Sequence, residues 1–365
     1  MHYVGVDLGD TRSSIAILND DGKVFKQMEV KGRWNEVVAR VSLLPRPMAI
    51  CYEASCGYGY LYEKFSTLSK RVEVAHPGQL RLIFRSKKKH NRVDALKIAK
   101  LLFLDEVPRV HVPAAEVRSW RMLIEYRQKL VAQRVSAKNQ IRTLLKSQGI
   151  EAVKSLWTAK GLAWLEALEL PELETLRREM MIDELKGLGA KINRIEMRLA
   201  KVAAGRPEVR LLMTIPGVGI RTAEALVAYV DDIGRFARLK RVGSYFGLVP
   251  CQDATGNVNR LGHITREGPA TVRKLLIEAA WQGIRRSPTI RAFFERIRRD
   301  DPDRKKIALV ATGHWLVRVM SSMLRSGECW RERTDLPMKD SPKGWLSISP
   351  PEDTGARKPV SSDVE

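Results

Sequence analysis

The chain has 365 residues, enough for roughly two or three domains with a sizeable hydrophobic core. Its 64 lysine and arginine residues outnumber its 42 aspartate and glutamate residues, and the resulting formal charge of +22 favours a polyanionic partner, nucleic acid before an anionic membrane. The four cysteines have no zinc-ligand spacing, which excludes a zinc finger and indicates reduced thiols. We find no signal peptide and no apolar run near the ~20 residues of a membrane span, so we expect a soluble, cytoplasmic protein.

The N-terminal stretch predicts a β-meander that carries one acid. Residues 2–7 form an apolar run ending in Asp7, residues 14–18 form a second run, and a polar turn at residues 19–22 leads into a third. A buried, unpaired carboxylate is costly, so Asp7 on this central strand needs a positive partner. The candidates are a metal ion, a phosphate held through a metal, and a structural arginine or lysine.

The next segments extend the meander into a mixed sheet. Helices are predicted at residues 34–44 and 60–68, and strands at residues 48–52 and 72–75. Three strands followed by helix, strand, helix, strand and helix indicate an α/β, ribonuclease H-like arrangement. Glu53 ends the fourth strand, so a second acid is expected beside Asp7.

A basic segment then leads into a helix with a third acid. Asn91 and Asp94 are three residues apart and share one face of the first helical turn. A charged run is usually a solvated surface, but a helix N-terminus favours phosphate, so we expect the neighbouring cations to contact nucleic acid. These cations are Lys87, Lys88, Lys89 and Arg92.

Residues 115–205 predict long amphipathic helices. From Met181 to Val202 the apolar positions alternate in steps of four and three, as in the core seam of a coiled coil. This pattern suits an intramolecular helical hairpin and a dimerising coiled coil equally well.

The remaining chain predicts a mostly helical domain. The IPGVG motif at residues 215–219 precedes a helix, so it is either a phosphate-binding turn or a plain interhelical turn. Further helices are predicted at residues 236–246, 270–285 and 307–324. A polar loop at residues 251–260 lies between the first two, and it is where we expect chemistry or phosphate contact.

Three acids on neighbouring elements predict a cation site. Converging carboxylates repel one another unless a cation lies between them, and Mg²⁺ or Mn²⁺ suits hard oxygen ligands. Such a cation polarises a phosphodiester, so Asp7, Glu53 and Asp94 are the candidate catalytic acids.

Taken together and in order, several motifs resemble one family. They are GVD at residues 5–7, YEA at 52–54, NRVDA at 91–95, IPGVG at 215–219, FGLVP at 246–250 and RLGHITREG at 260–268. The chain resembles, from about Tyr3 to Leu324, the bacterial insertion-sequence transposases that join a RuvC-like DEDD domain to a C-terminal serine domain, known as bridge-RNA-guided recombinases. The resemblance implies a RuvC-like catalytic domain at residues 1–113, a helical, coiled-coil region at 114–205 and a mostly α transposase domain at 206–330. Residues 331–365 are rich in proline, serine and charged residues, which predicts a disordered tail.

The resemblance also implies an activity. Members of this family recombine double-stranded donor and target DNA with Mg²⁺, and a hydroxyl of the C-terminal domain attacks the phosphate to give a covalent protein–DNA intermediate. A structured guide RNA pairs with the DNA, and the two domains meet across the protomers of a homo-oligomer, a dimer or tetramer. A nucleoid-associated protein that is not bound to membranes is expected.

Two positions depart from the family pattern. The third family acid falls at Asn91, whose amide oxygen can ligate Mg²⁺ with less charge, so the implied ligand set is Asp7, Glu53, Asn91 and Asp94. The family serine falls at Thr255. Three hypotheses follow: Thr255 is the nucleophile, Ser244 acts instead, or this copy is impaired. A hydroxyl that only ties the loop to its own backbone is the alternative role for Thr255.

Basic residues near Thr255 are predicted to contact nucleic acid, namely Arg241, Arg260, Arg266 and Arg273. Three other functions remain open. An ATPase of the actin or hexokinase type would need two further Gly-rich loops, which we do not find. A Holliday-junction resolvase would use water in place of the hydroxyl, and a non-catalytic nucleic-acid-binding relative would explain Asn91 and the missing serine.

Overall fold

The computed structural model describes residues 1–83, 91–255 and 258–332. The predicted contacts Lys87, Lys88 and Lys89 and the predicted tail from residue 333 onward lie outside these ranges. The N-terminal part contains a five-stranded sheet in the order β3-β2-β1-β4-β5. Its strands are β1 (His2–Asp7), β2 (Arg12–Leu18), β3 (Val24–Lys31), β4 (Met48–Glu53) and β5 (Arg71–Ala75). The first three strands pair antiparallel and β4 and β5 add in parallel, so the predicted meander is confirmed and β1 is central.

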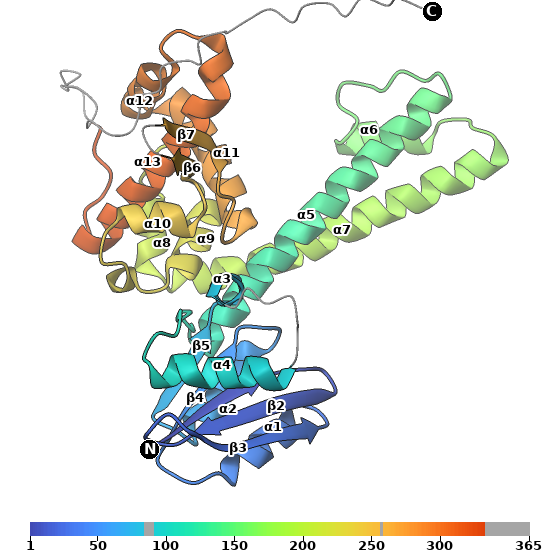
Figure 1. The fold of residues 1–365 in the computed structure, drawn as a ribbon. Coiled ribbons are helices and arrows are strands. Elements are labelled where there is room, and N and C mark those ends of the chain that lie inside the picture. The colour runs from blue at the N-terminus through green and yellow to red at the C-terminus, as the bar shows by residue number, and fades with distance from the viewer. Residues whose placement is uncertain (84–90, 256–257, 333–365) are drawn as a thin grey trace, which may run out of the picture.

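Helices cover both faces of this sheet (Figure 1). They are α1 (Trp34–Ser42), α2 (Tyr58–Ser66), α3 (Pro77–Ile83) and α4 (Asn91–Phe103). Alternate residues of a strand point to opposite faces, so Val4 and Val6 of β1 pack against α1 and α2. On the opposite face, Ala16 of β2 packs against Ala95 and Ala99 of α4. The N-terminal part is therefore a three-layer α/β unit.

Two long helices connect the N-terminal and C-terminal parts (Figure 1). They are α5 (Ala115–Ser147) and α7 (Glu172–Ala204), with the short α6 (Ala159–Glu166) between them. Leu188 and Ile192 from the predicted seam of α7 pack against Leu130 and Ala137 of α5. The seam is thus covered within one chain, which confirms the intramolecular helical hairpin.

The C-terminal part is mostly helical. Its helices are α8 (Pro207–Leu212), α9 (Ile220–Val230), the 3-10 turn η1 (Ile233–Arg235), α10 (Lys240–Tyr245), α11 (Ala270–Arg286), α12 (Pro288–Arg298), the 3-10 turn η2 (Pro302–Arg304) and α13 (Lys305–Ser326). The helix predicted at residues 236–246 was too long, because Phe236 is extended and buries its ring beside Tyr245. The polar loop predicted at residues 251–260 was also wrong. This segment belongs to an antiparallel hairpin of β6 (Pro250–Thr255) and β7 (Val258–Ile264).

Within the described residues, one segment is long and apolar enough to cross a membrane, namely Pro302–Ser326 with a mean hydropathy of 1.4. Polar residues such as Thr312 and Ser321 interrupt this segment, so it is not the uninterrupted apolar run of ~20 residues that the sequence prediction concerned. Leu316, Val317 and Met320 of α13 are fully buried in the core of the C-terminal part, and half of the apolar window is buried. These are features of a core helix of a folded domain.

One carboxylate fastens the C-terminal part to α5. The Tyr229 hydroxyl donates a hydrogen bond of 2.6 Å to Glu125 Oε1, and the Thr271 hydroxyl donates one of 2.6 Å to Glu125 Oε2. Arg121 adds a 2.7 Å hydrogen bond from its Nε to the Ala228 carbonyl. Glu125 of α5 therefore joins α9 and α11 at one point.

Candidate active site

The first two predicted acids lie at the same edge of the sheet. β1 and β4 are adjacent and parallel, and Val6 pairs with Tyr52 in their register. Asp7 and Glu53 are the next residues of the two strands, so both follow at the carboxyl end. Both side chains are half-buried. The topology thus brings the two acids side by side, as the sequence predicted.

Helix α4 brings the third acid to this edge. A Cβ built on Gly5 would lie 2.3 Å from the Ala95 carbonyl oxygen, so β1 and α4 touch through their backbones. At the other end of α4, the rings of Phe103 and Tyr3 have centroids 5.2 Å apart. Since residue 95 faces residue 5 and residue 103 faces residue 3, α4 runs antiparallel to β1. Asp94, in the first turn of α4, therefore lies toward the end of β1 that carries Asp7.

The carboxylates of Asp7, Glu53 and Asp94 do not form one metal-binding cluster in this structure. Asp94 forms an ion pair of 3.2 Å with Lys97. Across residues 1–83, 91–255 and 258–332, no three His, Cys, Asp or Glu side chains are close enough to hold a metal ion. Asn91 begins α4, and its side chain lies outside what the structure describes. The donors suit Mg²⁺ or Mn²⁺ by their chemical type, and the metal site itself stays a prediction.

The predicted nucleophiles lie in the other part of the molecule. Thr255 is the last residue of β6, is exposed, and pairs with Val258 of β7. Ser244 is exposed on α10. Figure 1 shows β6, β7 and α10 in the C-terminal part, well separated from β1 and α4 in the N-terminal part. Within one chain, neither hydroxyl is beside the acids.

The predicted nucleic-acid contacts fall into two groups. Arg241, Arg260 and Arg266 are exposed, and Arg266 has the positive φ of 57° that turns the chain after β7. Arg273 instead donates hydrogen bonds to the carbonyls of Phe246, Glu267 and Gly268. Burial, and then repulsion by Arg266, lowers the pKa of Arg273 below its usual value. These contacts favour a structural role for Arg273. Arg92 lies in the first turn of α4, and its side chain is not described.

The IPGVG motif makes a close helix contact. A Cβ on Gly217 would lie 2.4 Å from the backbone nitrogen of Gly283 in α11. Only glycine fits such an approach, so the motif packs α9 onto α11. This contact favours the plain interhelical turn over the phosphate-binding turn.

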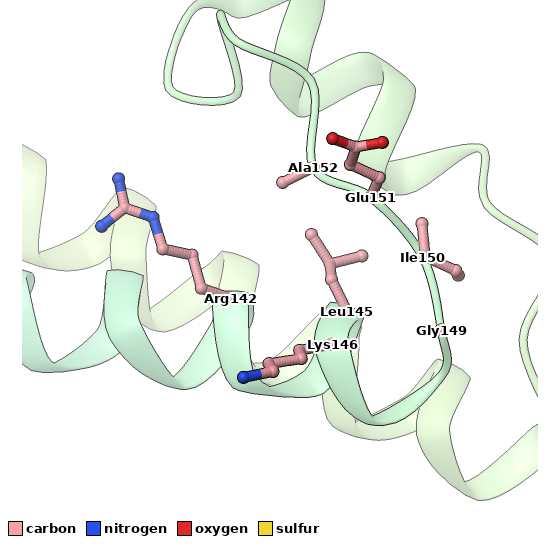
Figure 2. Close-up of a pocket in the computed structure, with 7 residues that line it drawn as sticks. All are labelled: Arg142, Leu145, Lys146, Gly149, Ile150, Glu151 and Ala152. Atoms are coloured by element: carbon pink, nitrogen blue, oxygen red, sulfur yellow. The ribbon is translucent and has the colours of Figure 1, made fainter.

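The sequence interpretation overlooked one set of basic residues on α5. Arg134, Lys138, Arg142 and Lys146 recur every four residues, so they lie on one face of the helix. The regular spacing was the available signal. Arg142 and Lys146 also line a hollow of about 470 Å³ at the end of α5 (Figure 2).

Comparisons with known proteins point to one family for both parts of the chain. A family model described as "Transposase", of the DEDD type named for IS110, matches residues 4–149, and a model described as "Transposase IS116/IS110/IS902 family" matches residues 209–295. The chain is 27% identical over 281 residues to the transposase for insertion sequence element IS1111A of Coxiella burnetii, covering 76% of each chain. It is 26% identical over 279 residues to the transposase for insertion sequence element IS1328 of Yersinia enterocolitica, covering 76% of this chain and 82% of that protein. Similarity to the transposase for insertion sequence element IS1533 of Leptospira borgpetersenii is 25% identity over 305 residues, 77% of this chain and 84% of the relative.

Proposed function

Because the chain belongs to the IS110/IS116/IS902 family of transposases, we propose that it cuts and rejoins double-stranded donor and target DNA through one of its own hydroxyl groups. One observation carries the proposal. The parallel β1–β4 pair and the close contact of α4 with Gly5 bring the elements bearing Asp7, Glu53 and Asp94 toward one edge of the five-stranded mixed sheet. Acids drawn from three separate elements at one edge suit cation-dependent phosphodiester chemistry.

Asp7, Glu53 and Asp94 are the residues that would hold Mg²⁺ or Mn²⁺, with the amide oxygen of Asn91 as a neutral further donor. Such an ion, when bound, polarises the phosphate and stabilises charge on the departing oxygen. If the cation binds here, Asp94 would give up its ion pair with Lys97 and coordinate the cation instead. Replacing an acid by Asn91 removes one negative charge from the site, so we expect weaker cation binding than a site with four acids would give.

The Thr255 hydroxyl is the proposed nucleophile. Its oxygen forms a bond to phosphorus while one P–O bond of the DNA backbone breaks, its proton passes to a base, and the departing oxygen gains a proton. The covalent threonyl–DNA ester conserves the energy of the broken bond, so the reverse attack by a DNA hydroxyl rejoins strands without ATP. The exposure of Thr255 at the end of β6 supports this role, since a DNA phosphate can reach it.

The separation of Thr255 from the acids supports a homo-oligomer. In one chain the hairpin and the sheet edge lie in different parts of the molecule (Figure 1). We propose that the acids of one protomer act with the hydroxyl of another in a dimer or tetramer. A structured guide RNA that pairs with the DNA is part of the same proposal, and sequencing the RNA that copurifies with the protein tests it.

A nicking assay with Mg²⁺ tests the chemistry. Asp7→Asn removes a charge without changing shape, and Thr255→Val removes the hydroxyl and keeps the branched side chain. Both variants are expected to lose strand cleavage, and a covalent protein–DNA adduct is expected only where Thr255 is intact. Ser244→Ala is the matched control and should retain the adduct. Loss of the adduct in Ser244→Ala with retention in Thr255→Val would move the nucleophile to Ser244.

A non-catalytic nucleic-acid-binding relative is the second candidate. The Asp94–Lys97 ion pair and the neutral Asn91 favour it, because both reduce the negative charge available to a cation. This candidate predicts tight RNA or DNA binding with no cleavage product at any Mg²⁺ or Mn²⁺ concentration. Product without an adduct would instead indicate a resolvase that uses water.

A further inference from the structure

Helix α5 carries a row of four cations at every fourth position, Arg134, Lys138, Arg142 and Lys146, which we call the α5 row. With a rise of ~1.5 Å per residue, neighbours in the row are about 6 Å apart along the helix axis and the whole row spans about 18 Å. Arg142 and Lys146 are exposed, and Arg134 and Lys138 are half-buried. The distal half of the helical hairpin extends away from both the N-terminal and the C-terminal part (Figure 1).

The α5 row is not neutralised within the described part of the chain. None of its four cations forms an ion pair there, whereas Arg177 and Lys186 on α7 pair with Glu174 and Glu166. Like charges four residues apart on a helix repel each other and destabilise the helix. Burial, and then repulsion by Arg134 and Arg142, lowers the pKa of Lys138 below its usual value. Because the four cations of the α5 row repel one another, an anionic partner would stabilise this part of the helix.

Local packing holds the row in place. Lys138 Nζ lies 4.8 Å from the centroid of the Trp157 ring, and Arg142 Cζ lies 5.3 Å from it. Cation–π contacts of this kind orient both cations without neutralising them. Arg142 and Lys146 also line the hollow of about 470 Å³ between α5 and residues 149–152 (Figure 2). Glu151 is the one acid among the residues that line this hollow.

We propose that the α5 row binds the phosphate backbone of duplex DNA outside the reacting site. Duplex DNA carries one negative charge per ~1.7 Å of its axis when both strands are counted, so a row of about 18 Å lies beside several phosphates at once. A rigid helix with cations on one face matches the regular charge of a duplex better than that of a flexible single strand. The choice of DNA as the polyanion rests on the proposed function, and the contact gives the helical hairpin a role in holding the DNA that flanks the cut.

Binding of the full-length chain to a duplex DNA oligonucleotide, measured by fluorescence anisotropy over a range of salt concentrations, tests the α5 row. The variant Arg142→Gln/Lys146→Gln removes two exposed cations of the row. Arg177→Gln/Lys186→Gln is the matched control, because it removes two cations that are already paired with acids on the same hairpin. We expect the row variant to bind about tenfold more weakly and its plot of log K against log salt to be shallower by about 2, with the control close to the parent.

Three further arms make the result decisive. Arg142→Lys/Lys146→Arg keeps the charge and should bind like the parent. Equal effects in the row variant and the control, or an effect on duplex RNA without one on duplex DNA, would overturn the inference. Circular dichroism of all variants separates lost binding from lost helix. Because binding is measured without cleavage, a chain that binds DNA through the row but forms no adduct would refute the proposed chemistry and leave this inference standing.

Discussion

The carbonyl oxygen of Ala95 lies so close to Gly5 that a methyl group on Gly5 would come within 2.3 Å of it. The backbone nitrogen of Ala99 would be 2.4 Å from the same methyl group. A strand and a helix can approach this closely only where the strand has no side chain. This contact sets the distance at which α4 packs on β1. It therefore also sets the position of Asp94 relative to Asp7.

Substituting this glycine should therefore affect both stability and the acid edge. Gly5→Ala forces α4 away from β1, and overpacking of this kind costs about 1–3 kcal/mol of the free energy of unfolding. Urea denaturation followed by circular dichroism measures the loss. We also expect lower strand cleavage per folded molecule, since Asp94 moves with α4. A variant as stable as the parent would show that the helix can shift without cost.

The opposite effect is expected at Gly187 in α7. A Cβ there would meet nothing within 4 Å, and the residue lies inside a long helix. Gly187→Ala should raise the free energy of unfolding by roughly 0.5–1 kcal/mol, because alanine loses less conformational entropy in a helix. Measured in the same urea series, it is the matched glycine control for Gly5→Ala. A loss of stability would mean that the exposed face of α7 contacts another part of an oligomer.

Much of the N-terminal part could be predicted because strand periodicity and turn residues are local signals. The alternation in β1 and the position of Glu53 at the end of β4 were enough to place both acids at one edge. Whether the carboxylates converge depends on side-chain partners such as Lys97, which spacing along the chain does not reveal.

The C-terminal part was harder to predict from the sequence. The sequence predicts a loop at the β6–β7 hairpin because residues 251–260 are mostly polar, although Gly256-Asn257 is a dipeptide typical of two-residue hairpin turns. Phe236 lies in a predicted helix but is extended in the structure, because its ring is buried in the core and tertiary packing decides its conformation. Long-range contacts, such as that of Glu125 with Tyr229, leave no periodic trace in the sequence.

The contact between Glu125 and Tyr229 should contribute measurably to the attachment of the C-terminal part. Tyr229→Phe removes a hydroxyl that donates to a carboxylate in a partly buried site, and hydrogen bonds to charged groups are worth about 1.5–3 kcal/mol. Thermal unfolding should show this loss. A double-mutant cycle with Glu125→Gln isolates the pair, and additive effects of the two substitutions would contradict a direct interaction.

His314 should make the C-terminal part sensitive to mild acid. It is buried in α13 beside α10, and burial, followed by repulsion from Arg318, lowers its pKa from 6.5 to about 4. Between these two values the unfolded chain binds a proton that the folded chain does not, so stability falls as the pH drops from about 6.5 to about 4 and this contribution then levels off. The total is at most about 3.4 kcal/mol, at 1.36 kcal/mol for each unit of pKa difference. Urea denaturation of the parent and of His314→Gln across this range provides the measurement. The variant should show a shallower dependence on pH, because it lacks the contribution of this one buried side chain. Parallel curves for parent and variant would show that His314 does not titrate in this way.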